Sequence, residues 1–271
     1  MCPELFHIGP LPIRSFGTAI ALSFFVGVLY IMRITRRDKK PIDQYVTIAY
    51  LMIFSGLLGA RLFYVLFHLD EFSGRWLDTI NPFQGPQFGI AGLNLYGGIL
   101  VGIVTTYLYC RKHSLKVLDV FDTFAPPMAL GIGISRIGCF LNGCCFGTPT
   151  DLPWSVQFPI GSIPYSVFGT AHIHPTQIYS SLYGLGLFLG LHFLLKHRRF
   201  IGQVTAIFFM VEAVFRYLIE NIRYYEKEMV FTIGGTTITY NQVISVSLFA
   251  AGLIIYLVSI RRRAHDGQTS R

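Results

Sequence analysis

Three arginines lie within or at the ends of long apolar stretches of this 271-residue chain, namely Arg61, Arg136 and Arg216. An ionisable group inside a bilayer costs at least ~2.5 kcal/mol, so it usually faces a polar interior and marks a functional site. A guanidinium group is a planar fork of N–H donors that binds two oxygens of one phosphate. If the fold brings these arginines to one surface, the chemistry they suit is recognition of a phosphate.

Glu212, Arg216 and Glu220 follow one another at intervals of four residues, a spacing that puts all three on one face of a helix. A charged stripe of this kind must face other helices or a water-filled cavity rather than acyl chains. One interpretation is a ladder of ion pairs that fixes helix packing. The other, which we favour, is the wall of a polar cavity.

Three of the five cysteines fall within one short segment: Cys139, Cys144 and Cys145. A disulfide such as Cys139–Cys144 is the favoured interpretation, and it requires Cα atoms within about 7 Å of each other. Reactive thiols are the alternative, because a neighbouring cation such as Arg136 lowers the pKa of a thiol. A metal site is disfavoured, because His174 is the only evident fourth ligand.

The composition places these residues in a membrane protein. Only 13% of the residues are charged, whereas a soluble protein of this size carries about 25%. The many glycine and phenylalanine residues, 27 and 24, are typical of helices that pack closely inside lipid. A disordered chain and a soluble globular enzyme are thereby excluded, and an all-α integral membrane protein is predicted.

Seven apolar stretches are long enough to cross a bilayer, which needs about 20 largely apolar residues. The predicted spans lie near residues 15–34, 44–67, 92–110, 117–137, 175–196, 201–222 and 242–260. Clusters of basic residues follow the first, third, fifth and seventh spans. Because such clusters stay in the cytoplasm, we expect the N-terminus outside and the C-terminus inside. No basic face interleaved with aromatic residues is visible, so we expect no nucleic-acid partner.

The helical rise of ~1.5 Å per residue gives the depth of each charge in its span. Arg61 lies about 25 Å along the second span, Arg216 about 22 Å along the sixth, and Arg136 at the end of the fourth. All three spans run outward, so the arginines belong near the outer leaflet, whereas Asp119 and Asp122 belong at the cytoplasmic end. The nearest phosphates are those of phospholipid headgroups, and a lipid-using enzyme is therefore expected.

Three segments deliver glycines and polar side chains to the same surface. Residues 131–147 combine five glycines with Arg136 and Asn142, residues 94–98 read Asn-Leu-Tyr-Gly-Gly, and residues 174–179 read His-Pro-Thr-Gln-Ile-Tyr. Glycines permit tight turns and close backbone approach, while Asn142 offers both donors and an acceptor. Together the segments predict one site at the outer ends of several helices.

In their order along the chain, these motifs resemble those of the prolipoprotein diacylglyceryl transferase family. The matching motifs are Arg136-Ile-Gly138 with Phe140, Asn142-Gly143, His174-Pro-Thr-Gln177-Ile-Tyr179, Phe215-Arg216-Tyr-Leu-Ile-Glu220, Ile8-Gly9-Pro10, Gly59-Ala60-Arg61-Leu62, Tyr96-Gly97-Gly98 and Asp122 before Ala125-Pro126. The resemblance implies a seven-helix fold with its N-terminus outside. It also implies transfer of a diacylglyceryl group from phosphatidylglycerol to the lipobox cysteine thiol of a prelipoprotein, with no cofactor and no metal.

The resemblance also implies roles for individual residues. The expected catalytic residues are Arg136, Arg216, Glu220 and Tyr96. The residues expected to bind phosphatidylglycerol are Arg136, Arg216, Asn142, Gly143, Arg61, His174 and Gln177. Arginines suit this reaction because the departing phosphate carries negative charge, and the acceptor must react as a thiolate.

Several positions differ from the family's usual pattern. Tyr96 stands where a histidine is usual, Cys139 where an asparagine is usual, and Cys144 where a glutamate is usual; Phe16 and Glu212 each replace a tyrosine. Thiol activation then falls to Tyr96, Glu212 or His174, or the acceptor has changed. The alternatives are a diverged member with another acceptor and a non-catalytic phospholipid-binding membrane protein.

Taken together, the sequence predicts one membrane-embedded domain over residues 1–271. We expect it in the bacterial inner membrane as a multi-pass protein whose active site faces the outer leaflet. The expected partners are phosphatidylglycerol, prelipoprotein signal peptides and membrane lipid.

Overall fold

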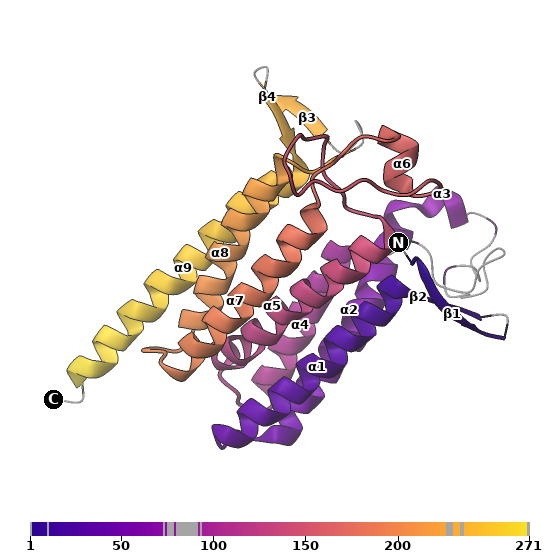
Figure 1. Cartoon of the computed structure of the whole chain (residues 1–271). Helices are drawn as coiled ribbons and strands as arrows, with labels where there is room; N and C mark the ends of the chain where they lie inside the picture. The colour runs from indigo at the N-terminus through magenta and orange to yellow at the C-terminus, as the bar shows by residue number, and fades with distance from the viewer. Residues whose placement is uncertain are drawn as a thin grey trace. The chain divides into compact units, whose positions relative to one another are not determined.

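A computed structural model describes residues 2–9, 11–72, 74, 79, 92, 94–225, 230–233 and 236–269. Its long helices are α1 Ser15–Arg37, α2 Ile42–Phe67, α4 Leu95–Lys112, α5 Val117–Asn142, α7 Thr176–Lys196, α8 Gln203–Glu220 and α9 Tyr240–Thr269 (Figure 1). Its short elements are α3 Leu69–Phe72, α6 Ile163–Phe168 and the strands β1 Glu4–Ile8, β2 Leu11–Arg14, β3 Val230–Ile233 and β4 Thr236–Thr239. The strands form two separate two-stranded sheets, β1–β2 and β3–β4.

The all-α fold class is confirmed, because each of the seven predicted stretches forms a long helix. Within the described residues, five helices are long and apolar enough to cross a membrane: α1, α2, α5, α7 and Tyr240–Arg263 of α9. The remaining two long helices, α4 and α8, have 18 residues each. They are more polar, since α4 ends in two basic residues and α8 carries two glutamates and an arginine.

The chain divides into two compact units. The first unit comprises Met1–Phe6, Ile13–Gly27 and Phe121–Arg271, and the second comprises His7–Pro12 and Val28–Val120. The first unit therefore contains α7, α8, α9 and most of α5, and the second contains α2 and α4.

In the second unit, α2 packs against α4 along a line of glycines. A Cβ atom added to Gly59 would lie 2.6 Å from the Val101 Cβ and 2.7 Å from the Gly97 carbonyl oxygen. One added to Gly98 would lie 2.7 Å from the Gly56 carbonyl oxygen. These distances are too short for real atoms, so glycine is what allows the two backbones to touch. Asn94 caps α4, and its side-chain oxygen accepts from the N–H of Tyr96 at 3.0 Å.

Asp119, at the start of α5, also belongs to the second unit and contacts two of its residues. The Lys40 ammonium lies 2.8 Å from one carboxylate oxygen. The Tyr45 hydroxyl donates to the same oxygen at 2.7 Å. The sequence placed Asp119 at the end of a span, and it lies in the first turn of α5.

In the first unit, α5 lies against α7 and the first half of α1 at points where only small residues fit. A Cβ atom added to Gly184 of α7 would lie 2.6 Å from the Gly133 nitrogen of α5. The Ser181 hydroxyl donates to the Gly133 carbonyl oxygen at 2.8 Å. On the other side of α5, a Cβ atom added to Gly138 would lie 2.6 Å from the Ala19 Cβ. These close contacts fix the position of the end of α5, where Arg136 lies.

The buried Asp122 carboxylate connects α5 to the beginning of α8. Its oxygens accept from the Gly202 N–H at 2.7 Å, from the Thr205 N–H at 2.9 Å and from the Thr205 hydroxyl at 2.7 Å. The Arg198 guanidinium lies 3.0 Å from the same carboxylate. The N–H groups at a helix start have no partner within the helix, so a carboxylate there satisfies donors and favours the helix dipole. Asp122 thus sets where α8 begins.

We predict that Asp122→Asn destabilises the protein by about 2–4 kcal/mol, because the half-buried Arg198 loses its ion pair with a buried carboxylate and one backbone donor loses its acceptor. The measurement is the thermal unfolding midpoint of the detergent-purified protein. The control is Asp151→Asn, which alters an exposed carboxylate of the same unit. Equal midpoints for the two variants would contradict this role of Asp122.

Candidate functional site

Glu220, the last residue of α8, is a buried carboxylate that faces two arginines in the first unit. Its Oε1 atom lies 3.3 Å from Nε of Arg216, one helical turn earlier, and 3.8 Å from a terminal nitrogen of Arg223. Its side chain is fully buried, whereas those of Arg216 and Arg223 are 24% and 13% exposed. A buried charge requires such partners. The charged stripe of α8 therefore includes real ion pairs.

Three polar side chains complete the environment of Glu220. The Tyr225 hydroxyl donates to Oε1 at 2.6 Å, while the Thr239 hydroxyl and the Asn241 amide donate to Oε2 at 3.2 and 3.3 Å. Asn241 also donates to the Tyr225 hydroxyl at 3.1 Å. Burial raises the pKa of Tyr225 against the opposing influence of Arg223, so the phenol stays protonated and remains a donor. The Glu220 cluster (Arg216, Glu220, Arg223, Tyr225, Thr239 and Asn241) thus joins the end of α8 to the start of α9.

Arg136, near the end of α5, belongs to the same electrostatic environment. It interacts with the carboxylate of Glu212 and with the thiol of Cys145. Glu212 also interacts with Arg216, one turn further along α8. Two arginines from different helices, Arg136 and Arg216, therefore share one acidic neighbour within the first unit.

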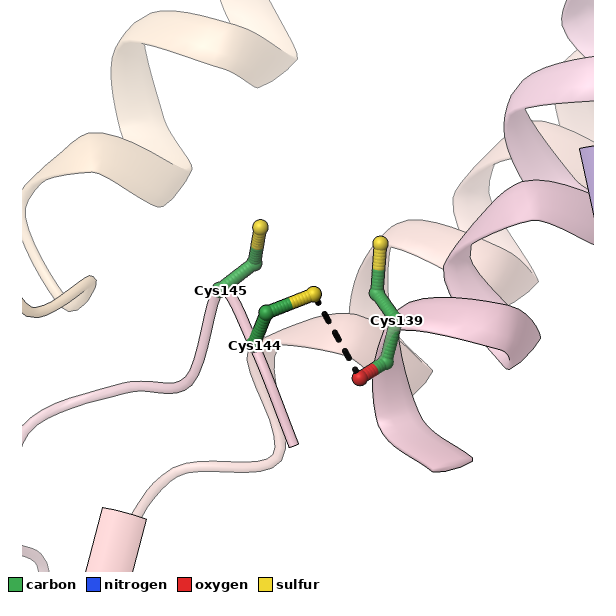
Figure 2. A group of neighbouring side chains, drawn as sticks. All are labelled: Cys139, Cys144 and Cys145. Carbon is green, nitrogen blue, oxygen red and sulfur yellow. Dashed lines mark hydrogen bonds between the residues drawn. The ribbon is translucent and has the colours of Figure 1, made fainter. Parts of the chain in front are cut away.

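After α5 ends at Asn142, the chain makes a tight turn that gathers three cysteines (Figure 2). Gly143 has a φ of 75° and Cys145 a φ of 62°. For a residue with a Cβ this left-handed conformation costs about 1–2 kcal/mol. The Cys144 N–H donates to the Cys139 carbonyl oxygen at 3.1 Å, and the Cys144 thiol lies 3.7 Å from the same oxygen. All three cysteines of this turn are free thiols in the structure.

Backbone pairing on both sides holds this cysteine turn (Cys139, Cys144 and Cys145) in place. The Cys144 carbonyl oxygen accepts from the Gln177 amide at 2.8 Å, and the Cys145 carbonyl oxygen accepts from the Thr176 hydroxyl at 2.7 Å. The segment that follows the turn pairs with residues 222–224, through Gly147↔Arg223 and a bond from the Tyr224 N–H to the Phe146 carbonyl oxygen. This pairing brings Arg223 beside the thiols.

The three thiols of the turn have unequal acidity. Hydrogen bonding with the Cys139 and Cys144 thiols lowers the pKa of Cys145, and Arg223 and Arg136 lower it further against the effect of burial. For Cys144, the lowering effect of the Cys139 hydrogen bond is outweighed by Cys145 and by burial, so its pKa is raised. Of Cys144 and Cys145, Cys145 therefore has the more acidic thiol.

The family to which the chain belongs follows from comparison with known proteins. A family model described as prolipoprotein diacylglyceryl transferase matches residues 3–258. The chain belongs to this family. A relative from Clostridium tetani, named phosphatidylglycerol–prolipoprotein diacylglyceryl transferase, is 34% identical over 226 residues, which cover 82% of this chain and 86% of its own.

Two more relatives with the same name match over greater lengths. The protein of Bordetella avium is 33% identical over 270 residues, 97% of each chain, and that of Finegoldia magna is 29% identical over 253 residues, 93% of each chain. The resemblance to prolipoprotein diacylglyceryl transferases drawn from the sequence motifs is confirmed. The possibility that this chain lies outside the family is thereby excluded.

Most of the predicted site residues of this family member belong to the first unit. These are Arg136, Cys139, Asn142, Gly143, Cys144, Cys145, His174, Gln177, Arg216 and Glu220. Gln177 supports the backbone of the cysteine turn. His174 supports the segment that follows the cysteine turn, and it does so through its main chain. Its N–H donates to the Thr148 carbonyl oxygen, and its carbonyl oxygen accepts from the Gly147 N–H.

Two predicted residues of the family site, Arg61 and Tyr96, belong to the second unit. Arg61 is buried, and its guanidinium donates to the carbonyl oxygens of Thr79 at 2.7 Å and Gly92 at 3.2 Å. It therefore holds backbone segments of its own unit. Tyr96 lies in the first turn of α4 and is 44% exposed.

The site residues expected from the sequence did not include four members of the Glu220 cluster: Arg223, Tyr225, Thr239 and Asn241. Arg223 follows Glu220 by three residues, a spacing that already predicts a contact within or just beyond a helix. Nothing in the spacing of the other three predicted a contact, because Tyr225 lies beyond the end of α8 and Thr239 and Asn241 reach Glu220 only when the chain folds back at α9. A prolipoprotein diacylglyceryl transferase motif search would also pass over them, since they lie outside the motifs noted above.

In the reduced protein, we predict that iodoacetamide modifies Cys145 at a rate that changes little between about pH 8 and about pH 6, while the Cys144 rate falls about tenfold per pH unit. The sign follows from the pKa values: a lowered pKa keeps the reactive thiolate as protons are added, and a raised one does not. Peptide mass spectrometry measures both rates. In Cys145→Ser the slowly varying component should vanish; parallel decay of both rates in the parent protein would refute the assignment.

Proposed function

We propose that this protein transfers a diacylglyceryl group from phosphatidylglycerol to the lipobox cysteine thiol of a prelipoprotein. The proposal rests on membership in the family and on one structural observation. The buried Glu220 carboxylate holds Arg216 next to Arg223. Arg216 and Arg136 also share an acidic neighbour, Glu212. Positioned guanidinium groups of this kind are what a departing phosphate ester requires.

In the proposed reaction, the acceptor sulfur forms a bond to the glyceryl carbon that carries the phosphate. The bond between that carbon and the phosphate oxygen breaks, its electrons stay on the oxygen, and glycerol phosphate leaves. The acceptor thiol loses its proton, which goes to a base or to the departing phosphate. Arg136 and Arg216 stabilise the negative charge that grows on the phosphate, because their charge is fixed before the reaction begins.

Glu220 acts in this proposal as a positioning residue. Its carboxylate contacts Nε of Arg216, which directs the terminal nitrogens of that guanidinium toward a ligand. Because the single Glu220 carboxylate faces two arginines, Arg216 and Arg223, the cluster has a net positive charge, which favours an anionic headgroup. Asn142 and Gly143, at the turn after α5, are proposed to line the same phosphatidylglycerol site, and His174 and Gln177 to support it.

We further propose that α4 and α8 also cross the membrane, which gives seven spans with the N-terminus outside and the C-terminus in the cytoplasm. The basic clusters at the C-terminal ends of α1, α4 and α7 and within α9 support this orientation through the positive-inside rule. The whole chain then acts as one domain of the bacterial inner membrane. Its site opens to the outer leaflet, where phosphatidylglycerol and a translocated prelipoprotein signal peptide meet.

Arg136→Ala and Arg216→Ala are each predicted to lower the transfer rate about 100-fold or more, which is the loss expected when one charge-stabilising donor is removed. The assay supplies phosphatidylglycerol vesicles and a lipobox peptide to the detergent-purified protein, and mass spectrometry detects a gain of one diacylglyceryl group. Arg199→Ala, which removes an exposed arginine of the same unit, serves as the control. Full activity of either variant would refute the proposal.

The same assay decides between acceptors. If the parent protein releases glycerol phosphate from phosphatidylglycerol but leaves the peptide unmodified, the acceptor differs from a lipobox thiol. If it neither releases glycerol phosphate nor modifies the peptide, a non-catalytic phospholipid-binding role is supported instead.

We predict that Tyr96→Phe lowers the transfer rate by about 100-fold, the scale of general acid–base catalysis, and that Tyr96→His retains more activity than Tyr96→Phe. The reason is that phenylalanine offers no proton-accepting atom, whereas the imidazole does. The pH dependence of the rate should shift toward lower pH in Tyr96→His, since imidazole loses its proton at lower pH than a phenol. Unchanged activity of Tyr96→Phe would exclude Tyr96 and leave Glu212 and His174 as candidates.

A further inference from the structure

The sulfur atoms of Cys139, Cys144 and Cys145 lie close together at the turn after α5 (Figure 2). All three lie within 4.8 Å of one another. Three sulfurs bound to one Zn²⁺ ion at 2.3 Å would be about 3.8 Å apart. The existing arrangement therefore has to contract by no more than about 1 Å to enclose such an ion, which side-chain rotation can supply.

We propose that Cys139, Cys144 and Cys145 form a binding site for a thiophilic metal ion of the Zn²⁺ class. Thiolate sulfur is the ligand that selects Zn²⁺ and Cu⁺ over the harder Mg²⁺ and Ca²⁺. The three sulfurs supply a trigonal set, and no fourth histidine, cysteine or acidic ligand joins the group in the part of the chain that the structure describes. The remaining coordination position of Zn²⁺ is then open to water.

The backbone of the turn is shaped to bring these sulfurs together. Adjacent side chains such as those of Cys144 and Cys145 diverge in a helix or a strand. Cys145 has a φ of 62°, and in this turn its sulfur lies within 4.8 Å of those of Cys139 and Cys144. A disulfide between Cys139 and Cys144 would not account for the strained, left-handed backbone of Cys145. A three-sulfur site uses all of them.

The site is held before any ion binds. Gln177 and Thr176, both buried at the start of α7, donate to the carbonyl oxygens of Cys144 and Cys145. Cys139 is itself buried, while Cys144 and Cys145 are partly accessible. An ion therefore has a path to the sulfurs, and little ordering has to accompany its binding.

The charges around the turn match a metal–thiolate complex. Binding forms three metal–sulfur bonds and releases to solvent the protons that the cysteine thiols still carry, so Zn²⁺ with three thiolates has a net charge of −1. Arg223 and Arg136 both interact with Cys145. The Nε atom of Arg223 is buried and has no hydrogen-bond partner among the described residues. An anionic complex beside it would offset this buried positive charge.

The proposal is tested by metal titration of the intact, detergent-purified protein, reduced and stripped with a chelator. We expect one Zn²⁺ per chain by isothermal calorimetry, and a thiolate charge-transfer absorption when Cd²⁺ replaces it. Cys144→Ser should weaken Zn²⁺ binding at least about 100-fold, beyond the loss that removal of an outer-shell partner causes. Cys2→Ser, which alters an exposed cysteine, should leave it unchanged.

A second measurement avoids substitutions and therefore any folding defect. In the parent protein, Zn²⁺ should slow maleimide modification of Cys144 and Cys145 but not of Cys2, as read by peptide mass spectrometry. Absence of stoichiometric Zn²⁺ binding by the reduced protein would overturn the proposal, as would equal binding by Cys144→Ser. A Cys139–Cys144 disulfide that persists in metal-free protein under mild reduction would also overturn it. None of these readouts depends on transferase activity, so the proposal stands or falls separately from the proposed function.

Discussion

The buried carboxylate of Glu220 is the charge on which the end of α8 and the start of α9 depend. Because its side chain is fully buried, every hydrogen bond that it accepts offsets a desolvation cost. Part of that compensation comes from α8 itself, part from the segment just after it, and part from residues 239–241. The partners are Arg216, Arg223, Tyr225, Thr239 and Asn241. A single acidic residue thereby fixes two guanidinium groups next to each other, an arrangement that their mutual repulsion would otherwise oppose.

Arg223 carries this order from the Glu220 cluster to the cysteine turn. It contacts the Glu220 carboxylate, interacts with Cys145, and is paired through its backbone with Gly147. Gly147 is needed there because a Cβ atom would lie 2.7 Å from the His174 carbonyl oxygen and 2.8 Å from that of Ile222. The arginines of the Glu220 cluster and the thiols of the cysteine turn are consequently parts of one electrostatic unit. An anion bound at either place affects the other.

Residues that the family motifs mark as functional divide into two physical kinds. Arg136 and Arg216 present positive charge, whereas Gln177 and Arg61 hold backbone carbonyl groups in place. Asp122 belongs to the second kind, since its carboxylate fixes the first turn of α8. A match to a motif therefore does not distinguish contact with the substrate from support of the residues that make it.

The sequence by itself determined the helical fold class, the position of all seven long helices and the family, because apolar length, helical spacing and motif order are local properties of the chain. It also placed Glu212, Arg216 and Glu220 on one helix face. Only the tertiary structure decided which partners Glu220 has, because two of them are distant in the sequence. Thr239 directly precedes α9, and Asn241 lies in the first turn of that helix. The convergence of three sulfurs was likewise decided there, since it depends on the left-handed backbone of Cys145 and on side chains of α7, neither of which cysteine spacing encodes.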